Sequence, residues 1–305
     1  MAVRTSSNAN SKSRALSHAL AIICILFCSL SCEHDEPVVR QAENAIIPVP
    51  LEIENSVSIQ QDTSVSRIVD EITVIHWNIG HFSLGKAKKS TISPENAESM
   101  LEKYHLLLDT LQADIAGICE YNATFAGNTG DTRKLLFRAF PNCVFGKHYS
   151  YNFNAVFSTF EIKKGEQFLF EQHVQKRYIL ETMHWINNEP VVVVETHLDW
   201  DEGSQGRLFR SLQLAEIARR YADVPHVIIC GDFNTSSPEE LDVFKKYGYT
   251  LLNDGSMKTY PAEKPAYPLD NIVVNGFHIV NSSIIEDPSL SDHSLIKCNL
   301  RFKNS

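Results

Sequence analysis

The stretch that decides the fold is "HVIICGDFNTSSPEEL", residues 226–241. The triplet "VII" at 227–229 predicts a buried strand, because β-branched residues suit a pleated surface that is packed on both sides. Gly231 then allows backbone geometry that other residues resist, and Asp232 and Asn234 follow two positions apart. Because residues i and i+2 of a strand share a face, the carboxylate and the carboxamide are expected to point into one space.

The last part of this stretch, "SSPEEL" at 236–241, predicts a helix cap followed by Pro238 in the first helical turn. Two interpretations of the acid and the amide follow. Asp232 and Asn234 could serve a functional site at the end of the strand, or they could form local hydrogen bonds in a strand-to-helix turn. The rest of the chain decides between them.

The first thirty residues predict an export signal. Three basic residues precede the mostly apolar run "ALAIICILFCSL" at 19–30. This run is too short to span a bilayer, but it suits the core of a secretory signal peptide. The following "SLSC" ends at Cys32 and resembles the lipobox of bacterial lipoproteins, with Ser29 where that motif usually has Leu.

These features predict a signal peptide over residues 1–31 and a lipidated Cys32. The acids of "CEHDE" resemble the signal that some two-membrane bacteria use for lipoproteins bound for the cell surface. We therefore expect an exported lipoprotein, anchored to a membrane in the periplasm or on the surface of a two-membrane bacterium. Residues 32–68 carry scattered charge and little periodicity, and they are expected to form the lipidated N-terminus and a tether.

The charge balance argues against a broad nucleic-acid platform. The chain carries 28 basic and 37 acidic residues, and removal of residues 1–31 would leave 25 basic residues and a net charge of −12. A surface that binds long nucleic acids is expected to carry clustered Lys and Arg. A nuclease is not excluded, because a metal ion can bring positive charge to the phosphate locally.

Four cysteines follow the predicted anchor, at positions 119, 143, 230 and 298. The sequence contains no CxxC motif and no paired His/Cys spacing, so it does not predict a zinc site. An exported location would permit disulfides, and the sequence leaves their pairing open. Cys119 and Cys230 each end an apolar run and are expected to be small buried residues.

Two segments have the apolar spacing of helices. Residues 93–112 follow a Ser-Pro start, and residues 204–222 form the second segment. The apolar side of the second helix is expected to carry Leu208, Leu212, Ala215 and Tyr221. Strand character is found in the segments 71–80, 113–120, 151–159, 166–172, 177–185, 189–201, 267–277, 278–285 and 293–302.

Many strands with only two long helices predict an α/β fold. We expect two packed mixed β-sheets with helices on the outer faces, a four-layer sandwich. One domain over residues 69–305 is the simplest division of the chain after the tether.

Polar residues stand at the ends of most of the predicted strands. They are Asn78, Glu120, His197, Asp199, Asp232, Asn234, Asp270, Asp292 and His293. The ends of core strands meet at a sheet edge, where open α/β folds bind their ligands. Each residue alone is weak evidence, because strand ends must become polar somewhere. Together, these acids, amides and imidazoles predict a functional site.

The order and local sequence of these residues resemble the endonuclease/exonuclease/phosphatase superfamily. The motifs that carry the resemblance are "WNI" at 77–79, "GDFN" at 231–234 and "SDH" at 291–293, with Glu120 about forty residues after the first motif. "FNAVFS" at 153–158 and "RSLQ" in the second helix are similar to two further segments of the family.

The sequence departs from the family pattern at two places. Cys119 stands where a Gln usually precedes the metal-binding Glu, and "LDNIVV" at 269–274 replaces the commoner Asp-Tyr-Ile-Phe pattern. These departures leave the metal ligand and the acid in place and affect only the subfamily. The resemblance implies a hydrolase of phosphoester bonds that depends on Mg²⁺, with Mn²⁺ as a substitute.

The residue types fit the roles that the resemblance implies. Mg²⁺ prefers few carboxylates and keeps water and phosphate oxygens in its shell, so Glu120 is the main expected ligand, with Asn78 beside it and Asp292 as a further contributor. Asp232 is suited to hold and deprotonate an attacking water. Asn234 is suited to orient the phosphate or the water.

His197 and His293 could donate hydrogen bonds to the phosphoryl oxygens in the transition state. Either Asp270 or Asp292 would fix the tautomer of His293 and raise its pKa; the resemblance favours such a pair without deciding which acid forms it. Asn154 and Asp199 are expected to position the substrate phosphate. The aromatic residues Trp77 and Phe233 are expected to pack under the site. His76, His81 and His105 are interpreted as structural.

Two classes of function remain open from the sequence. The first is the exported phosphoester hydrolase, a monomer acting on a nucleic acid, a phospholipid headgroup or a small phosphate ester. The second is a catalytically silent binding module that reuses the fold on a lipid anchor. Only the segments 86–90 and 131–138 are basic enough to suggest a nucleic-acid groove.

Overall fold

The computed structural model describes residues 48–55, 68–82, 94–121, 138–147 and 153–303. All of these segments belong to one compact unit, Ile46–Ser305. The predicted signal peptide, the predicted anchor Cys32 and the basic segment 86–90 lie outside the described residues, as does nearly all of segment 131–138. Among the helices that the structure describes, none is both long enough and apolar enough to cross a membrane.

The first sheet contains seven strands in the order β1-β7-β8-β9-β10-β12-β11. Their bounds are Val49–Pro50, Ile162–Leu169, Tyr178–Ile186, Glu189–His197, Val227–Asp232, Asp270–Asn275 and Thr250–Leu251, in that order. The β9–β10 pair is parallel and the other neighbours are antiparallel. The decisive stretch therefore forms a central strand, as its β-branched residues predict.

The second sheet also contains seven strands, in the order β13-β14-β3-β4-β6-β5-β2. Their bounds are Phe277–Ile285, Leu295–Phe302, Ile72–Asn78, Ile115–Tyr121, Phe153–Ser158, Asn142–Phe145 and Ile53–Asn55, in that order. Here the β3–β4 pair is parallel and the other neighbours are antiparallel. Both sheets are thus mixed, and each has one central parallel pair.

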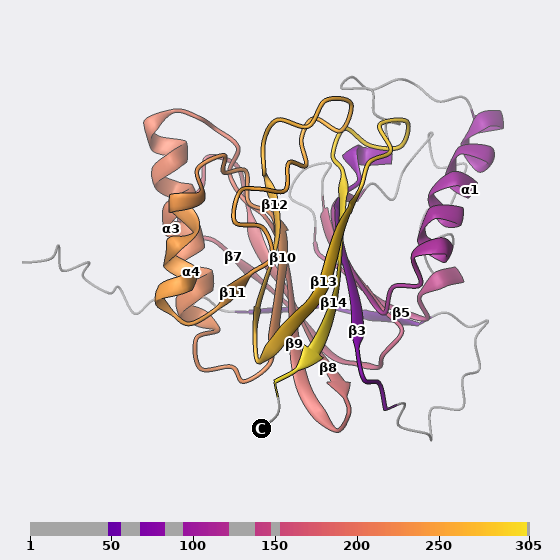
Figure 1. Cartoon of the computed structure of the whole chain (residues 1–305), viewed down its shortest axis with the longest axis horizontal. Coiled ribbons are helices and arrows are strands. Elements are labelled where there is room, and N and C mark those ends of the chain that lie inside the picture. Colours follow the sequence, from indigo (N-terminus) through magenta and orange to yellow (C-terminus); the bar gives the residue numbers. More distant parts are fainter. Residues whose placement is uncertain (1–47, 56–67, 83–93, 122–137, 148–152, 304–305) are drawn as a thin grey trace, which may run out of the picture. The chain divides into compact units, whose positions relative to one another are not determined.

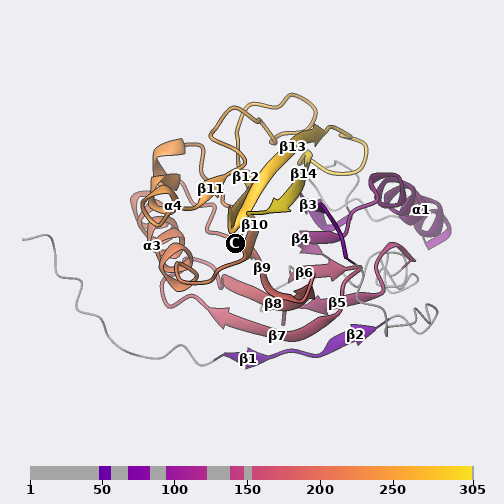
Figure 2. The ribbon, with the colours of Figure 1, turned by 60° about the horizontal axis from the view of Figure 1, so that its bottom comes forward.

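Helices cover the outer faces of the two sheets, which gives four layers (Figures 1 and 2). Three apolar cores lie between these layers. The first core lies between the sheets and joins residues of both, such as Ile72 and Ile228. The second lies between α1 (Pro94–Leu111) and the second sheet, and the third lies between α3 (Ser204–Arg220) and the first sheet. The short helices η1 (Gly80–Phe82), η3 (Pro238–Leu241) and α4 (Asp242–Lys246) complete the described elements. The predicted four-layer sandwich is confirmed.

The buried face of α3 differs from the predicted one, although Tyr221 at the end of the helix is buried as expected. Leu208 and Leu212 are 56% and 40% exposed, whereas Leu214, Ile217 and Ala218 are buried. The same buried face carries two polar residues, Arg210 and Gln213. Apolar periodicity assigns polar residues such as Arg210 and Gln213 to the solvent side of a helix. The predicted buried face was therefore rotated away from the observed one.

Folded structure begins before the predicted boundary at residue 69. Strands β1 and β2 belong to the segment expected to be tether. Val49 pairs with Gln167 at the edge of the first sheet, and Ile53 pairs with Val144 at the edge of the second. Residues 48–55 therefore add one edge strand to each sheet.

The four cysteines that follow position 32 are all buried, and none of them forms a disulfide bond. Cys143 packs in the core between α1 and the second sheet, and Cys230 and Cys298 pack in the core between the sheets. Burial raises the pKa of the Cys230 thiol well above its usual value. These three residues act as small apolar side chains, whereas Cys119 also takes part in a polar cluster described below.

Candidate active site

The ends of three neighbouring strands of the first sheet bring their polar residues into one row. Asp232, the last residue of β10, lies opposite His197, the last residue of β9, and opposite Asp270, the first residue of β12. Asn78, the last residue of β3, reaches this row from the second sheet, because its Nδ2 donates to Asp232 Oδ2 at 2.9 Å. The site is therefore assembled where the two sheets meet.

A pocket of about 620 Å³ opens above this row. Seven residues expected from the sequence line it, namely Asn78, Glu120, His197, Asp232, Asn234, Asp292 and His293. The remaining lining residues are Gln175, Arg177, Trp200, Glu202, Ser236, Tyr260, Tyr267 and Leu269.

Asp232 is nearly inaccessible to solvent and accepts two hydrogen bonds. Its Oδ2 receives the bond from Asn78, and its Oδ1 accepts from the backbone N–H of Asn234 at 3.0 Å. Burial and the negative charge of Asp270 raise the pKa of Asp232 to about 6, against the opposing effects of His293 and of these hydrogen bonds. A carboxylate held in this way is a stronger base than a solvated one.

His293 pairs with Asp270, which settles the alternative that the sequence left open. The distance from His293 Nδ1 to Asp270 Oδ2 is 2.8 Å. Burial alone would lower the pKa of His293, but Asp270 and Asp232 outweigh it and raise the pKa to about 10. With Nδ1 donating to Asp270, Nε2 lies 3.8 Å from Asp232 Oδ2 and carries a proton toward the pocket.

The "SDH" motif holds His293 in place through its serine and its backbone. Ser291 Oγ donates to the carbonyl of Asn78 at 2.7 Å and accepts the N–H of His293 at 3.1 Å. Trp77 Nε1 donates to the carbonyl of His293 at 3.0 Å. These hydrogen bonds hold the loop before β14 against the end of β3, so they fix the position of His293 relative to Asn78.

His197 differs from His293 in its charge. Burial and the nearby Arg177 lower the pKa of His197 well below its usual value, although Glu120 acts in the opposite direction. Its Nε2 lies 3.6 Å from Asp232 Oδ2. The site therefore combines an imidazolium at His293 with a neutral imidazole at His197.

Glu120 reaches the pocket because the backbone of β4 is irregular there. The pairing of β4 with β6 shifts register between Ile118 and Tyr121, and Glu120 has a φ of 53°. A non-glycine residue in this left-handed region costs about 1–3 kcal/mol, and such residues cluster at functional sites. The bulge turns the Glu120 side chain out of the strand's alternation and into the pocket.

The donor set at this point fits a hard divalent cation. Burial would raise the pKa of Glu120, but a hydrogen bond from His81 and the histidines of the site outweigh it and lower the pKa to about 2. Glu120 is thus ionised, and Asn78 and Asp292 bring further oxygen donors to the same pocket. Carboxylate and amide oxygens without a thiolate are the ligands that Mg²⁺ or Mn²⁺ would take.

Three expected site residues lie away from the pocket surface. Asp270 is completely buried behind His293. Asn154 is buried in β6, where its backbone N–H donates to Tyr178 Oη at 2.7 Å. Asp199 is also buried, and it accepts the N–H groups of Val174 and Gln175 at 3.0 and 3.1 Å.

Asp199 was expected to position the substrate phosphate from the end of a predicted strand. Strand β9 ends at His197, two residues before Asp199. Gln213 Nε2 also donates to Asp199 Oδ2, at 2.8 Å. Asp199 therefore acts indirectly, by holding the loop that brings Gln175 and Arg177 to the pocket.

The histidines interpreted as structural all have acidic partners. His81 Nε2 lies 2.9 Å from Glu120 Oε2, and His105 Nε2 lies 3.0 Å from Asp109 Oδ2 on the same helix. His76 contacts both Asp270 and Glu195. His81 thus belongs to the surroundings of Glu120, which its position after "WNIG" could have suggested.

Sequence reasoning missed Arg177 and the aromatic residues of the pocket. Arg177 lies just before β8, in a segment whose expected role was only to form a strand, and it gives the pocket a fixed positive charge. Trp200 and Tyr267 are 56% and 50% exposed, and the ring of Tyr260 packs against His293 with centroids 4.7 Å apart. The sequence offered one signal for such pocket residues, a position just after the end of a strand. Among the residues that were missed, only Trp200 stands at such a position.

This arrangement of a buried base, an imidazolium and an oxygen-rich cation site on a two-sheet sandwich defines a metal-dependent phosphoester hydrolase. The sequence profile of the Endonuclease/Exonuclease/phosphatase family matches residues 75–293. The chain belongs to this family.

Solved structures share the fold at low sequence identity. Humanized TDP2 from D. rerio matches with 15% identity and a TM-score of 0.59, over 76% of this chain and 100% of that one. An endonuclease/exonuclease/phosphatase from Beutenbergia cavernae matches with 18% identity and a TM-score of 0.57, over 77% and 72%. The mannosyl-6-phosphatase Bt3783 from Bacteroides thetaiotaomicron matches with 16% identity and a TM-score of 0.56, over 76% and 100%. No curated protein sequence matches the chain.

Glu120→Gln should weaken the response to metal. The substitution keeps the size of the side chain but removes the charge that holds the cation, so the Mg²⁺ concentration for half-maximal activity should rise by about 10- to 100-fold. Hydrolysis of bis(p-nitrophenyl) phosphate during a MgCl₂ titration measures this. Glu263→Gln, an exposed acid outside the pocket lining, is the matched control. An unchanged metal titration for Glu120→Gln would contradict the assignment.

Asp232→Asn should lower kcat with little change in stability. Loss of the base is expected to cost about 10²- to 10⁴-fold in kcat. Burial disfavours the ionised form of Asp232, whereas the amide nitrogen cannot accept one of its two hydrogen bonds. These effects oppose each other, so the melting temperature should change little. Kinetics and thermal melts at pH 7 check both parts, with the exposed Asp254→Asn as control. A folded variant with nearly wild-type kcat would remove Asp232 from the role of base.

Proposed function

We propose that the protein is an exported, Mg²⁺-dependent hydrolase of small phosphate esters. The observation that carries the proposal is the composition of the pocket. It brings together an ionised Glu120, the neighbouring Asp232 and His293, and the fixed charge of Arg177. The same pocket carries an aromatic rim, formed by the exposed side chains of Trp200 and Tyr267. These groups match the needs of phosphoryl transfer from a compact substrate.

The reaction is hydrolysis, in which a P–O bond forms to water and the P–O bond to the leaving group breaks. Asp232 accepts the proton of the attacking water, assisted by the amide of Asn234, which lines the same pocket. His293 and Arg177 donate to the phosphoryl oxygens as negative charge develops on them. Asn78 holds Asp232 from the second sheet, so the base is oriented before the substrate arrives.

Glu120, Asn78 and Asp292 would hold the cation. When bound, Mg²⁺ supplies charge that neutralises the phosphate and polarises its oxygens. Without that charge the substrate would meet four carboxylates in one pocket, those of Glu120, Glu202, Asp232 and Asp292, and repulsion would oppose binding. Divalent metal and substrate are therefore expected to bind together.

Charge favours a small substrate over a long polyanion. The chain has a net charge of −9. Among the described residues that line the pocket, Arg177 alone carries a permanent positive charge beside the histidines. Many phosphate contacts from Lys and Arg are needed for strong binding of a nucleic acid. One phosphate group, held by the metal, Arg177 and His293, matches the donors that this pocket offers.

The aromatic rim favours a substrate with a ring next to its phosphate. Trp200 and Tyr267 keep about half of their surface exposed at the pocket. An exposed indole beside a polar site offers a stacking face for a sugar or an aromatic ring. Neighbouring structures include the mannosyl-6-phosphatase and a D. rerio TDP2 complexed with single strand DNA product, and the acidic character of the pocket favours the smaller class.

The alternative of a catalytically silent binding module lacks support. Such a module is expected to have lost one or more of the residues that carry the chemistry. Glu120, Asp232, Asn234 and His293 are all retained, and all four line the same pocket. The family assignment and this geometry favour the enzyme.

Small esters should be turned over efficiently and with little dependence on salt. For residues 33–305, we expect kcat/KM on p-nitrophenyl phosphate or a hexose 6-phosphate to exceed that on a long DNA duplex. Binding of the duplex should be weak and should change little between about 50 and 200 mM salt, because few counterions are released. Tight duplex binding that weakens steeply over this range would contradict the proposal.

The aromatic rim gives a separate test within the same assay. Trp200→Ala should raise KM for a ring-bearing phosphate by about tenfold, the order expected for loss of a stacking face, and should leave kcat nearly unchanged. Trp185→Ala is the matched control, because Trp185 is also exposed but does not line the pocket. Equal KM values for the two variants would remove the rim from substrate binding.

The proposed location rests on the N-terminal sequence alone. Cys32→Ser should abolish acylation and release the protein from membranes, because no other hydrophobic anchor is expected after cleavage. Cys28→Ser, within the predicted signal peptide, should leave anchoring intact. Membrane fractionation with detection of the acyl group distinguishes them, and a cleaved Cys32→Ser protein that stays in the membrane fraction would contradict the proposed anchor.

A further inference from the structure

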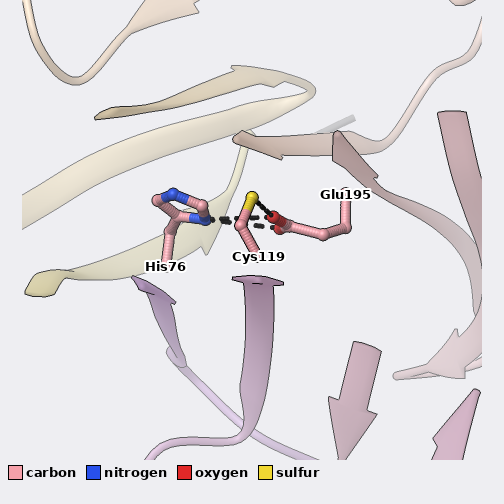
Figure 3. Close-up of side chains that lie close together, drawn as sticks. All are labelled: His76, Cys119 and Glu195. Atoms are coloured by element: carbon pink, nitrogen blue, oxygen red, sulfur yellow. Dashed lines mark hydrogen bonds and ion pairs between the residues drawn. The ribbon is translucent and has the colours of Figure 1, made fainter. Parts of the chain in front are cut away.

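A chain of buried polar side chains continues behind the His293–Asp270 pair. Asp270 uses Oδ2 for His293, and its Oδ1 lies 3.0 Å from His76 Nε2. The other ring nitrogen of His76, Nδ1, lies 3.3 Å from Glu195. Cys119 Sγ donates to Glu195 Oε1 at 2.9 Å (Figure 3). His293 is thus the end of this chain at the pocket, and the chain runs from it through Asp270 and His76 to Glu195.

The chain crosses between the two sheets at each step. His76 and Cys119 belong to β3 and β4 of the second sheet, and Glu195 and Asp270 belong to β9 and β12 of the first. All four side chains are completely buried. Burial of such groups is costly unless they are paired, and apolar residues of similar volume would pack this core at lower cost. The retained polarity therefore calls for a role beyond packing.

The backbone makes room for the Glu195 carboxylate. Gly117 lies opposite His76 in the β3–β4 pair. A Cβ atom at position 117 would lie 2.0 Å from Glu195 Oε2, which is too close for any side chain. The absence of a side chain at Gly117 allows Glu195 to reach His76, so the sheet is built around this contact.

We propose that His76 is a positioning residue for the hydrolytic reaction, acting on His293 through Asp270. The Nε2–H of His76 fixes one oxygen of Asp270, which leaves the other oxygen directed at His293 Nδ1. Glu195, which accepts a hydrogen bond from Cys119, holds the His76 ring from the opposite side. The proposal rests on the phosphoester hydrolase activity, and it assigns a function to a histidine that does not reach the pocket.

The same cluster could instead hold a metal ion. Ligand atoms of His76, Cys119 and Glu195 lie within 4.8 Å of one another. The geometry favours direct hydrogen bonding, because the thiol and the imidazole both point at the carboxylate of Glu195 (Figure 3). Metal content is therefore one outcome of the test, and stoichiometric zinc that is lost in Cys119→Ser would overturn the proposal.

Two amide substitutions separate the two sides of the His76 ring. The amide of Gln can take the place of Nε2 and donate to Asp270, whereas the amide of Asn lies near Nδ1 and can reach only Glu195. His76→Asn should lower kcat for bis(p-nitrophenyl) phosphate with Mg²⁺ by about 10- to 100-fold, the range typical of removing a partner behind a functional side chain. KM should be unchanged, and His76→Gln should recover most of the kcat.

A double-mutant cycle tests the route through His293. In the His293→Ala background, His76→Asn should cause no further loss of kcat, because residues that act through one another are not additive. Losses that multiply would show that His76 acts elsewhere, for example through Asn78, and would overturn the proposal. The proposal would also be overturned if His76→Gln lost as much kcat as His293→Ala. That comparison does not need His76→Asn, so the test remains valid if His76→Asn fails to fold.

His184→Asn is the matched control for burial. His184 is also a completely buried histidine, and its ring contacts Thr182 on the same strand at 2.8 Å. Thermal melts should show comparable changes for His76→Asn and His184→Asn, whereas kcat should fall only in the first. Equal effects of the two variants on kcat would show that His76 contributes only to packing in the core.

A spectroscopic readout separates failure of this proposal from failure of the proposed function. In protein labelled with ¹⁵N-histidine, the Nδ1–H proton of His293, identified by its loss in His293→Ala, should be present in wild type and His76→Gln. It should shift or broaden in His76→Asn, and no substrate is needed. An unchanged signal in folded His76→Asn would overturn the proposal, whereas an inactive wild-type protein with the expected spectra would overturn only the proposed function.

Discussion

The site depends on hydrogen bonds that cross from one sheet to the other. Asn78 donates from the second sheet to Asp232 in the first, and His293 in turn pairs with Asp270 across the same interface. Apolar side chains between the sheets supply most of the attraction, but that attraction has no direction and permits small sliding. Hydrogen bonds between buried groups have a narrow geometry. They therefore fix the relative position of the two sheets at the end where the chemistry occurs.

Much of the site could be predicted because its residues stand where buried strands end. Asn78, His197 and Asp232 are each the last residue of a strand, and the sequence marks that position by a change from apolar to polar. The choice of Asp270 as partner of His293 depended on the antiparallel register of β10 and β12, which no local pattern contains. The buried side of α3 was predicted wrongly for a related reason, since Arg210 is buried by pairing with the distant Glu240.

Several residues of the site adopt backbone conformations that are unfavourable for their side chains. His81, Glu120 and Asn234 have φ values of 57°, 53° and 51°, and all three adjoin or line the pocket. At each position the positive φ raises the free energy of the backbone, and it also directs a side chain or N–H group toward the site. Asn234 illustrates this, because its N–H is the donor that Asp232 accepts. Propensity argues against such conformations, so sequence patterns could locate these residues but not orient them.

Strands β1 and β2 close one edge of each sheet, through their pairing with β7 and β5. A sheet edge without a partner presents a row of free N–H and C=O groups to any other extended chain. A shortened protein that began at residue 69 would uncover both edges and gain two surfaces for self-association. Residues 48–55 thus belong to the folded domain and cover two sheet edges, and a shortened protein is expected to stay soluble only if it begins before β1.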